Sequence, residues 1–147
     1  MQTRTEALGY SVDEIITLSS IIEKEAKFSS DLSLISSVFH NRLNHAKKYP
    51  FLQSDATIAY AMQHMTGMRP SSKDIKIDYE SPYNTYLHEG LTPGPISNPG
   101  YSAMAAALYP SQTGYYYFVS YDSGYTLYAE TLADHQANVE LVKNASD

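Results

Sequence analysis

The chain has 147 residues, of which 43% are hydrophobic, so it is long enough for one domain with a closed core and leaves little room for a second. Sixteen Asp and Glu against ten Lys and Arg leave a formal net charge of −6, and the basic stripe that a nucleic-acid-binding protein needs is absent. The lack of cysteine excludes disulfides, thiolate metal sites and a cysteine nucleophile, and no apolar stretch approaches the roughly 20 residues of a membrane span.

Two helices are predicted in the N-terminal third of the chain. Ser11 and Glu14 have the spacing of a capping box, in which each side chain bonds the backbone N–H of the other, and this predicts a helix over residues 12–27. Apolar residues at spacings of three and four predict a second helix over residues 31–46.

A third helix and a long loop follow. Residues 56–65 have helical character, with Ser54 or Asp55 as the N-cap and Gly67 at the end. Residues 79–100 are rich in Pro, Gly and Tyr, which makes them too irregular for a helix or strand and too aromatic for a flexible linker. A long anchored loop in a compact domain is often a binding loop, so this segment is expected to border the active site.

The C-terminal part combines helices with a hairpin. Asn98 as the cap and Pro99 as the first helical residue predict a fourth helix. Two strands over residues 115–121 and 125–129, separated by an Asp-Ser-Gly turn, predict an antiparallel hairpin, and Thr131 is a suitable cap for a last helix. Four to five helices with a small antiparallel sheet make the expected fold α+β.

One glutamate is aimed at the core. On a helical wheel, Glu25 lies in the middle of the apolar stripe that contains Leu18 and Ile22, whereas Glu23 lies towards the opposite side. Partly apolar surroundings raise the pKa of a carboxyl group, and a raised pKa keeps a proton available near neutral pH, as a general acid requires. The alternative is structural: Glu25 ends the helix and reaches solvent, or pairs with a basic residue such as Arg42. Periodicity alone leaves both interpretations open.

Five blocks of the sequence, in order and at matching spacing, resemble the MltG (YceG-like) family of endolytic murein transglycosylases. The blocks are SSIIEKEA, SVFHNRL, LQSDATIAYA, SPYNTYLHEGLTPGPISNPG and YYYFVSYDSGYTLYAETLADH. The resemblance implies that residues 1–147 are a single catalytic domain that cuts the glycan strands of peptidoglycan. It also implies an N-terminal membrane anchor and a small accessory domain outside these residues. The chain departs from the family pattern at Thr92, Tyr125 and Tyr128, none of which is the expected catalytic residue.

The resemblance also implies roles for individual residues. Glu25 is the second Glu of the EKE block, the family's catalytic acid/base, so the helical wheel and the family indicate the same residue. Asn41 and Arg42 are expected to orient Glu25, unless they form an ordinary ion pair or a solvated helix face. The residues expected to contact substrate, through amide and hydroxyl hydrogen bonds or by stacking tyrosines on sugars, are Gln53, Ser54, Asp55, Tyr83, Asn84, Thr85, Tyr86 and Asn98.

Three functions are compatible with these residues. In a lytic transglycosylase, as the resemblance implies, Glu25 protonates the leaving oxygen and then deprotonates the C6 hydroxyl of the same sugar, which leaves a 1,6-anhydro-MurNAc end. A muramidase-type hydrolase would use Glu25 and Asp55 as its two carboxylates, although Asp55, like Asn98, is also a suitable helix N-cap. The third possibility is a non-catalytic peptidoglycan-binding domain in which Glu25 is structural.

Neither a cofactor nor a metal is expected, because the five histidines are scattered and neither HExxH nor GxSxG occurs. The expected partners are peptidoglycan glycan strands and, from the family alone, peptidoglycan synthases. The resemblance places the full-length protein outside the cytoplasm, where an N-terminal anchor outside these residues would attach it to the cytoplasmic membrane.

Overall fold

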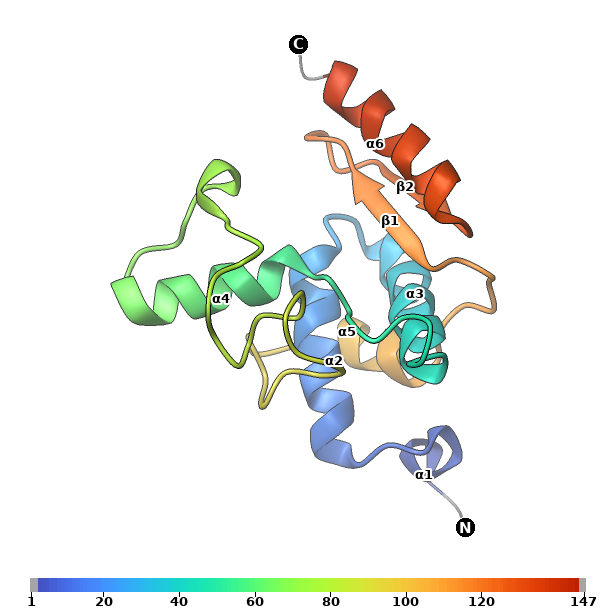
Figure 1. The fold of residues 1–147 in the computed structure, drawn as a ribbon. Helices are drawn as coiled ribbons and strands as arrows, with labels where there is room; N and C mark the ends of the chain where they lie inside the picture. Colours follow the sequence, from blue (N-terminus) through green and yellow to red (C-terminus); the bar gives the residue numbers. More distant parts are fainter. Residues whose placement is uncertain (1–2, 146–147) are drawn as a thin grey trace.

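Six α-helices and one two-stranded antiparallel sheet form the part of the chain that the computed structural model describes, residues 3–145 (Figure 1). The predicted α+β class is therefore confirmed. Two short 3₁₀ turns, Ser29–Asp31 and Ser72–Asp74, lie between helices. The helices and strands are α1 (Arg4–Leu8), α2 (Val12–Glu25), α3 (Leu32–Asn44), α4 (Asp55–Thr66), α5 (Tyr101–Leu108), β1 (Tyr117–Ser120), β2 (Thr126–Ala129) and α6 (Leu132–Ala145).

Capping boxes start the first two helices. Ser11 Oγ accepts the backbone N–H of Glu14 at 3.1 Å, and the Glu14 carboxylate accepts that of Ser11 at 3.0 Å, as the sequence predicts for α2. Thr3 and Glu6 form the same reciprocal pair at the start of α1, at 3.3 and 3.1 Å. Helix α1 is missing from the predicted elements because five residues are too few for an apolar repeat, although its capping signal is present in the sequence.

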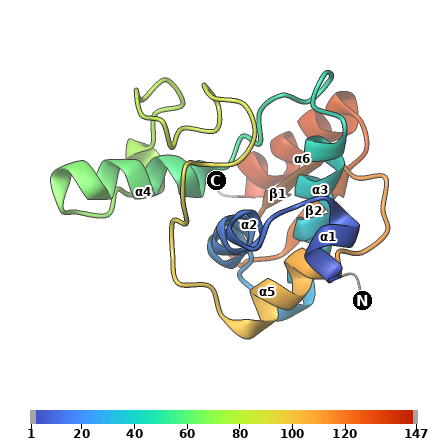
Figure 2. The same ribbon diagram turned by 90° about the horizontal axis from the view of Figure 1, so that it is seen from below.

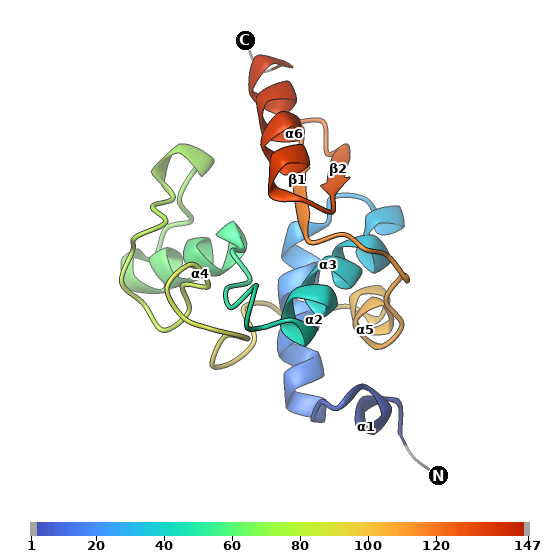
Figure 3. The ribbon, with the colours of Figure 1, turned by 45° about the vertical axis from the view of Figure 1, so that its right-hand side comes forward.

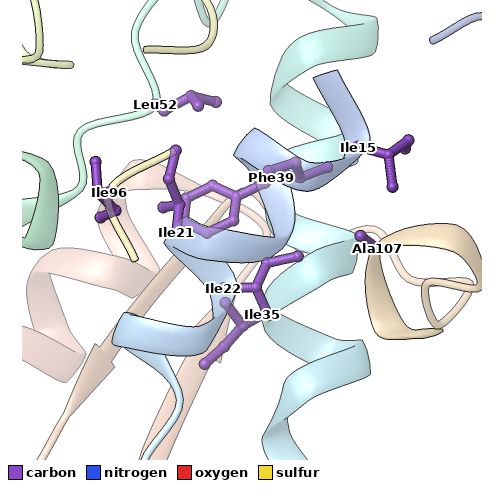
Figure 4. Close-up of a cluster of buried hydrophobic side chains, with 9 residues drawn as sticks. Ile15, Ile21, Ile22, Ile35, Phe39, Leu52, Ile96 and Ala107 are labelled. Carbon is purple, nitrogen blue, oxygen red and sulfur yellow. The ribbon is translucent and has the colours of Figure 1, made fainter. Parts of the chain in front are cut away.

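The core forms where α2 packs against α3 and α5, and side chains from these helices meet two from loops (Figure 4). The apolar side predicted for α2 is confirmed, because its members Leu18, Ile21 and Ile22 are all buried. Each such side chain contributes roughly 2 kcal/mol to folding through burial. The cluster comprises Ile15, Leu18, Ile21, Ile22, Ile35, Phe39, Leu52, Ile96 and Ala107.

Small residues bring α5 close to its neighbours. Ala103, Ala106 and Ala107 are buried, and hydrogen bonds join the end of α5 to α3. Ser36 Oγ donates to the Ala106 carbonyl and the His40 ring bonds the Ala107 carbonyl, each at 2.7 Å. These contacts use carbonyls at the end of α5 that have no partner within the helix.

Helix α5 starts later than the sequence predicts. The prediction of Asn98 as cap and Pro99 as first helical residue was wrong, because Gly100 is the cap. The backbone N–H of Ile96 donates to Ser20 Oγ at 3.0 Å, and the next side chain donates to the Ser20 carbonyl at the same distance. These bonds hold the chain extended along α2 just before α5, so the helix begins two residues later.

Residues 117–120 of β1 pair antiparallel with residues 126–129 of β2, and α6 packs on both strands (Figure 3). The hairpin is confirmed, but β1 is shorter than the predicted 115–121. The Tyr115 carbonyl accepts a hydrogen bond from the Asn41 amide at 2.8 Å, so this part of the segment is held by α3 and does not extend the strand.

Helix α4 extends to one side of α2, away from α6 and the hairpin (Figures 1 and 2). The loop over residues 79–100 contains neither helix nor strand, as predicted. It is anchored where Gln53 N–H donates to the Thr85 carbonyl at 3.2 Å and where Gly90 N–H donates to the Pro50 carbonyl at 3.1 Å. None of the helices within residues 3–145 combines the length and apolar character needed to cross a membrane.

Candidate active site

Glu25, the last residue of α2, lies against the beginning of α4. Its carboxylate accepts a hydrogen bond from Ser54 Oγ and faces the backbone N–H of Ala56 at 3.5 Å. The first turn of a helix presents unpaired N–H groups and partial positive charge, both of which stabilise an anion. Because Ser54 gives its hydroxyl to Glu25, it makes no side-chain cap on α4.

Opposing influences set the pKa of Glu25. Burial has the largest effect and raises the pKa because it disfavours the charged form. The hydrogen bond from Ser54 lowers it, the negative charge of Asp55 raises it and the Ala56 N–H lowers it, which leaves the pKa of Glu25 above its ordinary value. A carboxyl with a raised pKa, with donors facing its charged form, is suited to give a proton and take one back.

Two substitutions are expected to move the pKa of Glu25 in opposite directions. Ser54→Ala removes a donor to the carboxylate, so the pKa rises, and Asp55→Asn removes a neighbouring negative charge, so it falls. NMR titration of the Glu25 carboxyl carbon measures both shifts. Asp13→Asn, in the exposed first turn of α2, is the matched control and should leave the titration unchanged. Shifts of the same sign in the first two variants would contradict this account.

Glu25 opens onto a cleft of about 410 Å³, a size within the range of small-ligand sites. Parts of α2, α3, α4, α6 and β1 contribute to its wall, together with the segment before α4 and the loop 79–100. We call it the Glu25 cleft. Its polar and charged lining residues are Lys24, Glu25, Lys27, Arg42, Gln53, Asp55, Tyr86, Tyr117, Ser120 and His135.

Asp55 and Tyr86, both predicted to contact substrate, line the Glu25 cleft as a bonded pair. The Tyr86 hydroxyl donates to Asp55 Oδ1 at 2.7 Å. Burial, reinforced by this bond, raises the pKa of Tyr86, so the phenol keeps its proton. Asp55 is the first residue of α4 and Ser54 is the cap, so the alternative of Asp55 as N-cap was wrong. The carboxylate of Asp55 is therefore held in the cleft beside Glu25.

Gln53 also lines the cleft, and its backbone is strained. Its φ of 56° lies in the left-handed region, which costs a residue with a side chain roughly 1–2 kcal/mol. Such a conformation persists where the surroundings fix it, and here the Gln53 N–H is bonded to the Thr85 carbonyl at 3.2 Å. Gln53 is exposed and lines the cleft together with Leu52 and Asp55.

Asn84 and Thr85, both predicted to contact substrate, are buried in the loop and do not line the Glu25 cleft. Their exposed fractions are 0% and 2%. The Asn84 amide donates to two carbonyls of the preceding turn at 3.0 and 2.8 Å and accepts the Tyr86 N–H at 2.8 Å. Thr85 Oγ1 accepts the Ser54 N–H at 2.9 Å. Buried polar groups of a loop need such internal partners.

The remaining three predicted contacts also lie outside the cleft lining. Ser54 is buried, with its hydroxyl engaged by Glu25. The Tyr83 ring packs against Tyr60 with centroids 5.0 Å apart. Asn98 lines a different pocket, along α4.

Asn41 and Arg42 support the wall of the cleft. Both side chains donate to backbone carbonyls in residues 113–116, at distances of 2.6 to 3.0 Å, and Arg42 also donates to the Phe51 carbonyl at 2.7 Å. Among the described residues, neither side chain forms a hydrogen bond with Glu25, so any orienting effect on Glu25 acts through the wall that they hold. The alternative of an ion pair with Arg42 is also not found.

Five polar or charged residues of the cleft were not predicted: Lys24, Lys27, Tyr117, Ser120 and His135. Lys24 and Lys27 add positive charge on either side of Glu25 in the sequence. Tyr117 lies between Arg42, 4.9 Å from its ring centroid, and His135, whose ring stacks on it at 5.0 Å and 20°. Burial, with the positive charge of Arg42, lowers the pKa of His135, so its imidazole is neutral at neutral pH.

No three His, Asp or Glu side chains within residues 3–145 are grouped as ligands for a metal ion. The chemistry that this geometry supports is proton transfer by Glu25 to a polar ligand in the cleft, with Asp55 as a nearby negative charge.

Comparisons with known proteins agree with one another. The model of the YceG-like family matches residues 1–141. The endolytic murein transglycosylase of Bacillus subtilis (strain 168) is 47% identical over 126 residues, which are 85% of this chain and 33% of that protein. The endolytic murein transglycosylase of Streptococcus pneumoniae serotype 2 (strain D39) is 36% identical over 132 residues, 88% of this chain and 23% of that protein.

A crystal structure of a yceG-like protein from Listeria monocytogenes has the same fold, with a TM-score of 0.77 and 43% identity. The match covers 91% of this chain and 42% of that chain. The chain thus spans a third or less of the length of the curated relatives it matches.

Proposed function

The chain belongs to the YceG-like family, and we propose that it is the catalytic domain of an endolytic lytic transglycosylase. Its substrate is the MurNAc-β-1,4-GlcNAc bond of nascent peptidoglycan strands, and Glu25 is its acid and base. The observation that supports this proposal is the Glu25 carboxyl. It has a raised pKa, lines a cleft and accepts a hydrogen bond from Ser54 at the start of α4. The names of two relatives, at 47% and 36% identity, support the same class of reaction.

The reaction needs one group that first gives and then accepts a proton. Glu25 protonates the glycosidic oxygen while the bond from that oxygen to the MurNAc anomeric carbon breaks, and the GlcNAc leaves with a free hydroxyl. The C6 hydroxyl of the same MurNAc then attacks the anomeric carbon and returns its proton to Glu25. A 1,6-anhydro ring forms, no water is consumed and the carboxyl is restored for the next cycle.

The surroundings of Glu25 suit both halves of this cycle. Burial favours the protonated form that starts the reaction, because it raises the pKa of the carboxyl. Between the two proton transfers the group is a carboxylate, and the hydroxyl of Ser54 and the N–H of Ala56 then stabilise it. Asp55 adds a negative charge that favours the positive charge developing on the sugar ring.

A muramidase-type hydrolase is the second candidate, and the position of Asp55 favours it. This carboxylate lines the same cleft and lies close enough to raise the pKa of Glu25. Two carboxylates flanking one glycosidic bond are what a hydrolase requires, with the second acting on water or on the anomeric carbon. The hydrogen bond from the Tyr86 hydroxyl would then orient the Asp55 carboxylate for that step.

Product analysis distinguishes the two. Un-crosslinked glycan strands are incubated with the chain, and the new ends are identified by mass spectrometry. We expect 1,6-anhydro-MurNAc ends. If new reducing ends form instead and are lost in Asp55→Asn, the chain is a hydrolase and not a transglycosylase. Intact strands after incubation with a folded chain would contradict both.

The site of action follows from the substrate. Peptidoglycan lies outside the cytoplasmic membrane, so we propose an extracytoplasmic location for this domain. Membrane anchoring and association with peptidoglycan synthases, both implied by the family resemblance, are part of the same proposal.

A further inference from the structure

A second pocket, of about 400 Å³, adjoins the Glu25 cleft, and Lys24 lines both. One face of α4 forms its wall, with Ala56, Ala59, Tyr60 and Gln63 at the three- and four-residue spacing of a helix face. We call it the α4 pocket. It begins next to the acid, because Ala56 lines the pocket and its backbone N–H lies 3.5 Å from the Glu25 carboxylate.

The α4 pocket is lined by basic side chains and by no carboxylate. Lys24, His64 and Arg69 contribute to it together with uncharged residues. Within residues 3–145, neither Lys24 nor Arg69 forms a salt bridge or donates a side-chain hydrogen bond. Two unpaired cations on one pocket, in a chain with sixteen acidic and ten basic residues, indicate an anionic ligand.

The pocket has the length of a short peptide. The stretch of α4 from Ala56 to Gln63 is about 10 Å long, at 1.5 Å per residue, and Arg69 follows beyond the end of the helix. An extended chain covers about 3.3 Å per residue, so roughly three residues fit along this face. Ala59 and Ile96 give the pocket an apolar side that accommodates small side chains.

We propose that the α4 pocket binds the stem peptide of the substrate, with Lys24 and Arg69 pairing with its carboxylates. The inference rests on the proposed function, since it requires a peptidoglycan strand in the Glu25 cleft. The lactyl carboxyl of MurNAc is amide-linked to the peptide, so the glycan itself is uncharged and the carboxylates belong to the peptide. Unpaired cations therefore match the peptide better than they match further sugar units, and a guanidinium binds a carboxylate through two parallel hydrogen bonds.

The test compares glycan strands that carry stem peptides with the same strands after an amidase has removed them, which leaves a free lactyl carboxylate on each MurNAc. We expect the unchanged chain to have a higher kcat/KM on the peptide-bearing strands. In Arg69→Gln, the ratio of the two kcat/KM values is expected to fall about tenfold, the effect of one charge-assisted hydrogen bond. Arg69→Lys keeps the charge without the bidentate geometry and should recover part of the ratio.

Lys73→Gln is the matched control, because Lys73 is an exposed cation nearby in sequence that does not line the pocket. It should leave the ratio unchanged. An equal loss on both substrates in Arg69→Gln would overturn the inference and make the pocket a subsite for the sugar or for its lactyl carboxylate. An unchanged ratio in Arg69→Gln would overturn it as well.

A binding measurement separates this inference from the proposed function, because it needs no cleavage. NMR titration of the chain with N-acetylmuramoyl-pentapeptide is expected to shift the signals of Arg69 and its neighbours, and N-acetylmuramic acid alone should not. If the peptide binds in this way and no strand is cleaved, the pocket assignment stands and the proposed reaction fails. If both probes give the same shifts, or neither gives any, the pocket does not recognise the peptide.

Discussion

Glu25→Gln is expected to lower kcat/KM for glycan cleavage by about 10³-fold, within the range that general acid–base groups contribute. The amide neither gives nor takes a proton at neutral pH. Its carbonyl oxygen still accepts the Ser54 hydroxyl, so the start of α4 keeps its contact with the end of α2. Cleavage of un-crosslinked strands measures the loss, and a thermal melt confirms that the variant is folded.

Glu23→Gln is the matched control for this loss. Glu23 lies two residues earlier on α2, accepts the Gly100 N–H at 3.4 Å and does not line the Glu25 cleft. It should retain cleavage. Equal losses in the two variants would contradict the role of Glu25. If neither variant nor the unchanged chain cleaves strands and all three bind them equally well, the domain is a binding module with a structural Glu25.

The position of Glu25 was predictable because it depends on local information. The capping box at Ser11 fixes where α2 begins, and the spacing from Leu18 and Ile22 then decides which face the side chain occupies. Its hydrogen bond with Ser54 was not predictable in the same way, since 29 residues separate the two partners. That contact depends on how α4 packs against the end of α2.

The loop residues show why a role in the loop and a role in binding look alike in the sequence. Asn84 and Thr85 were candidates for substrate contact because they match a block of the family and carry hydrogen-bonding side chains. A long loop on a compact domain also has backbone N–H and C=O groups that need hydrogen-bond partners. The side chains of Asn84 and Thr85 both bond such backbone groups. Tyr86, two residues after Asn84, reaches the cleft. Polarity in the sequence therefore did not distinguish a ligand contact from an internal one.

Two of the missed residues belong to the far wall of the cleft. His135 comes from α6 and Tyr117 from β1, and they meet because α6 packs on the hairpin. Neither periodicity nor spacing relates these elements to Glu25 at the other end of the chain. Long-range packing of this kind is also why β1 is shorter than predicted. Side chains of α3 donate hydrogen bonds to the carbonyls just before β1.

Arg42→Met is expected to destabilise the fold by about 3 kcal/mol, because charge-assisted hydrogen bonds contribute roughly 1.5–3 kcal/mol each. Arg42 is 5% exposed and donates to the carbonyls of Tyr116 and Phe51 at 2.6 and 2.7 Å. Its guanidinium also lies over the Tyr117 ring. Methionine keeps an unbranched apolar side chain in this place but leaves both carbonyls without their donor.

Thermal unfolding followed by circular dichroism measures this change, and for a chain of this size the expected fall in Tm is roughly 6–12 °C. Arg69→Met is the matched control, because Arg69 is exposed and its side chain has no hydrogen bond or salt bridge in residues 3–145, so its Tm should change little. Equal shifts in the two variants would show that Arg42 contributes no more than a surface charge. With the expected shift, Arg42 is the residue that joins α3 to both β1 and the segment before α4. Those two elements supply Tyr117 and Gln53 to the Glu25 cleft, so Arg42→Met should also lower cleavage at temperatures where the variant is still folded.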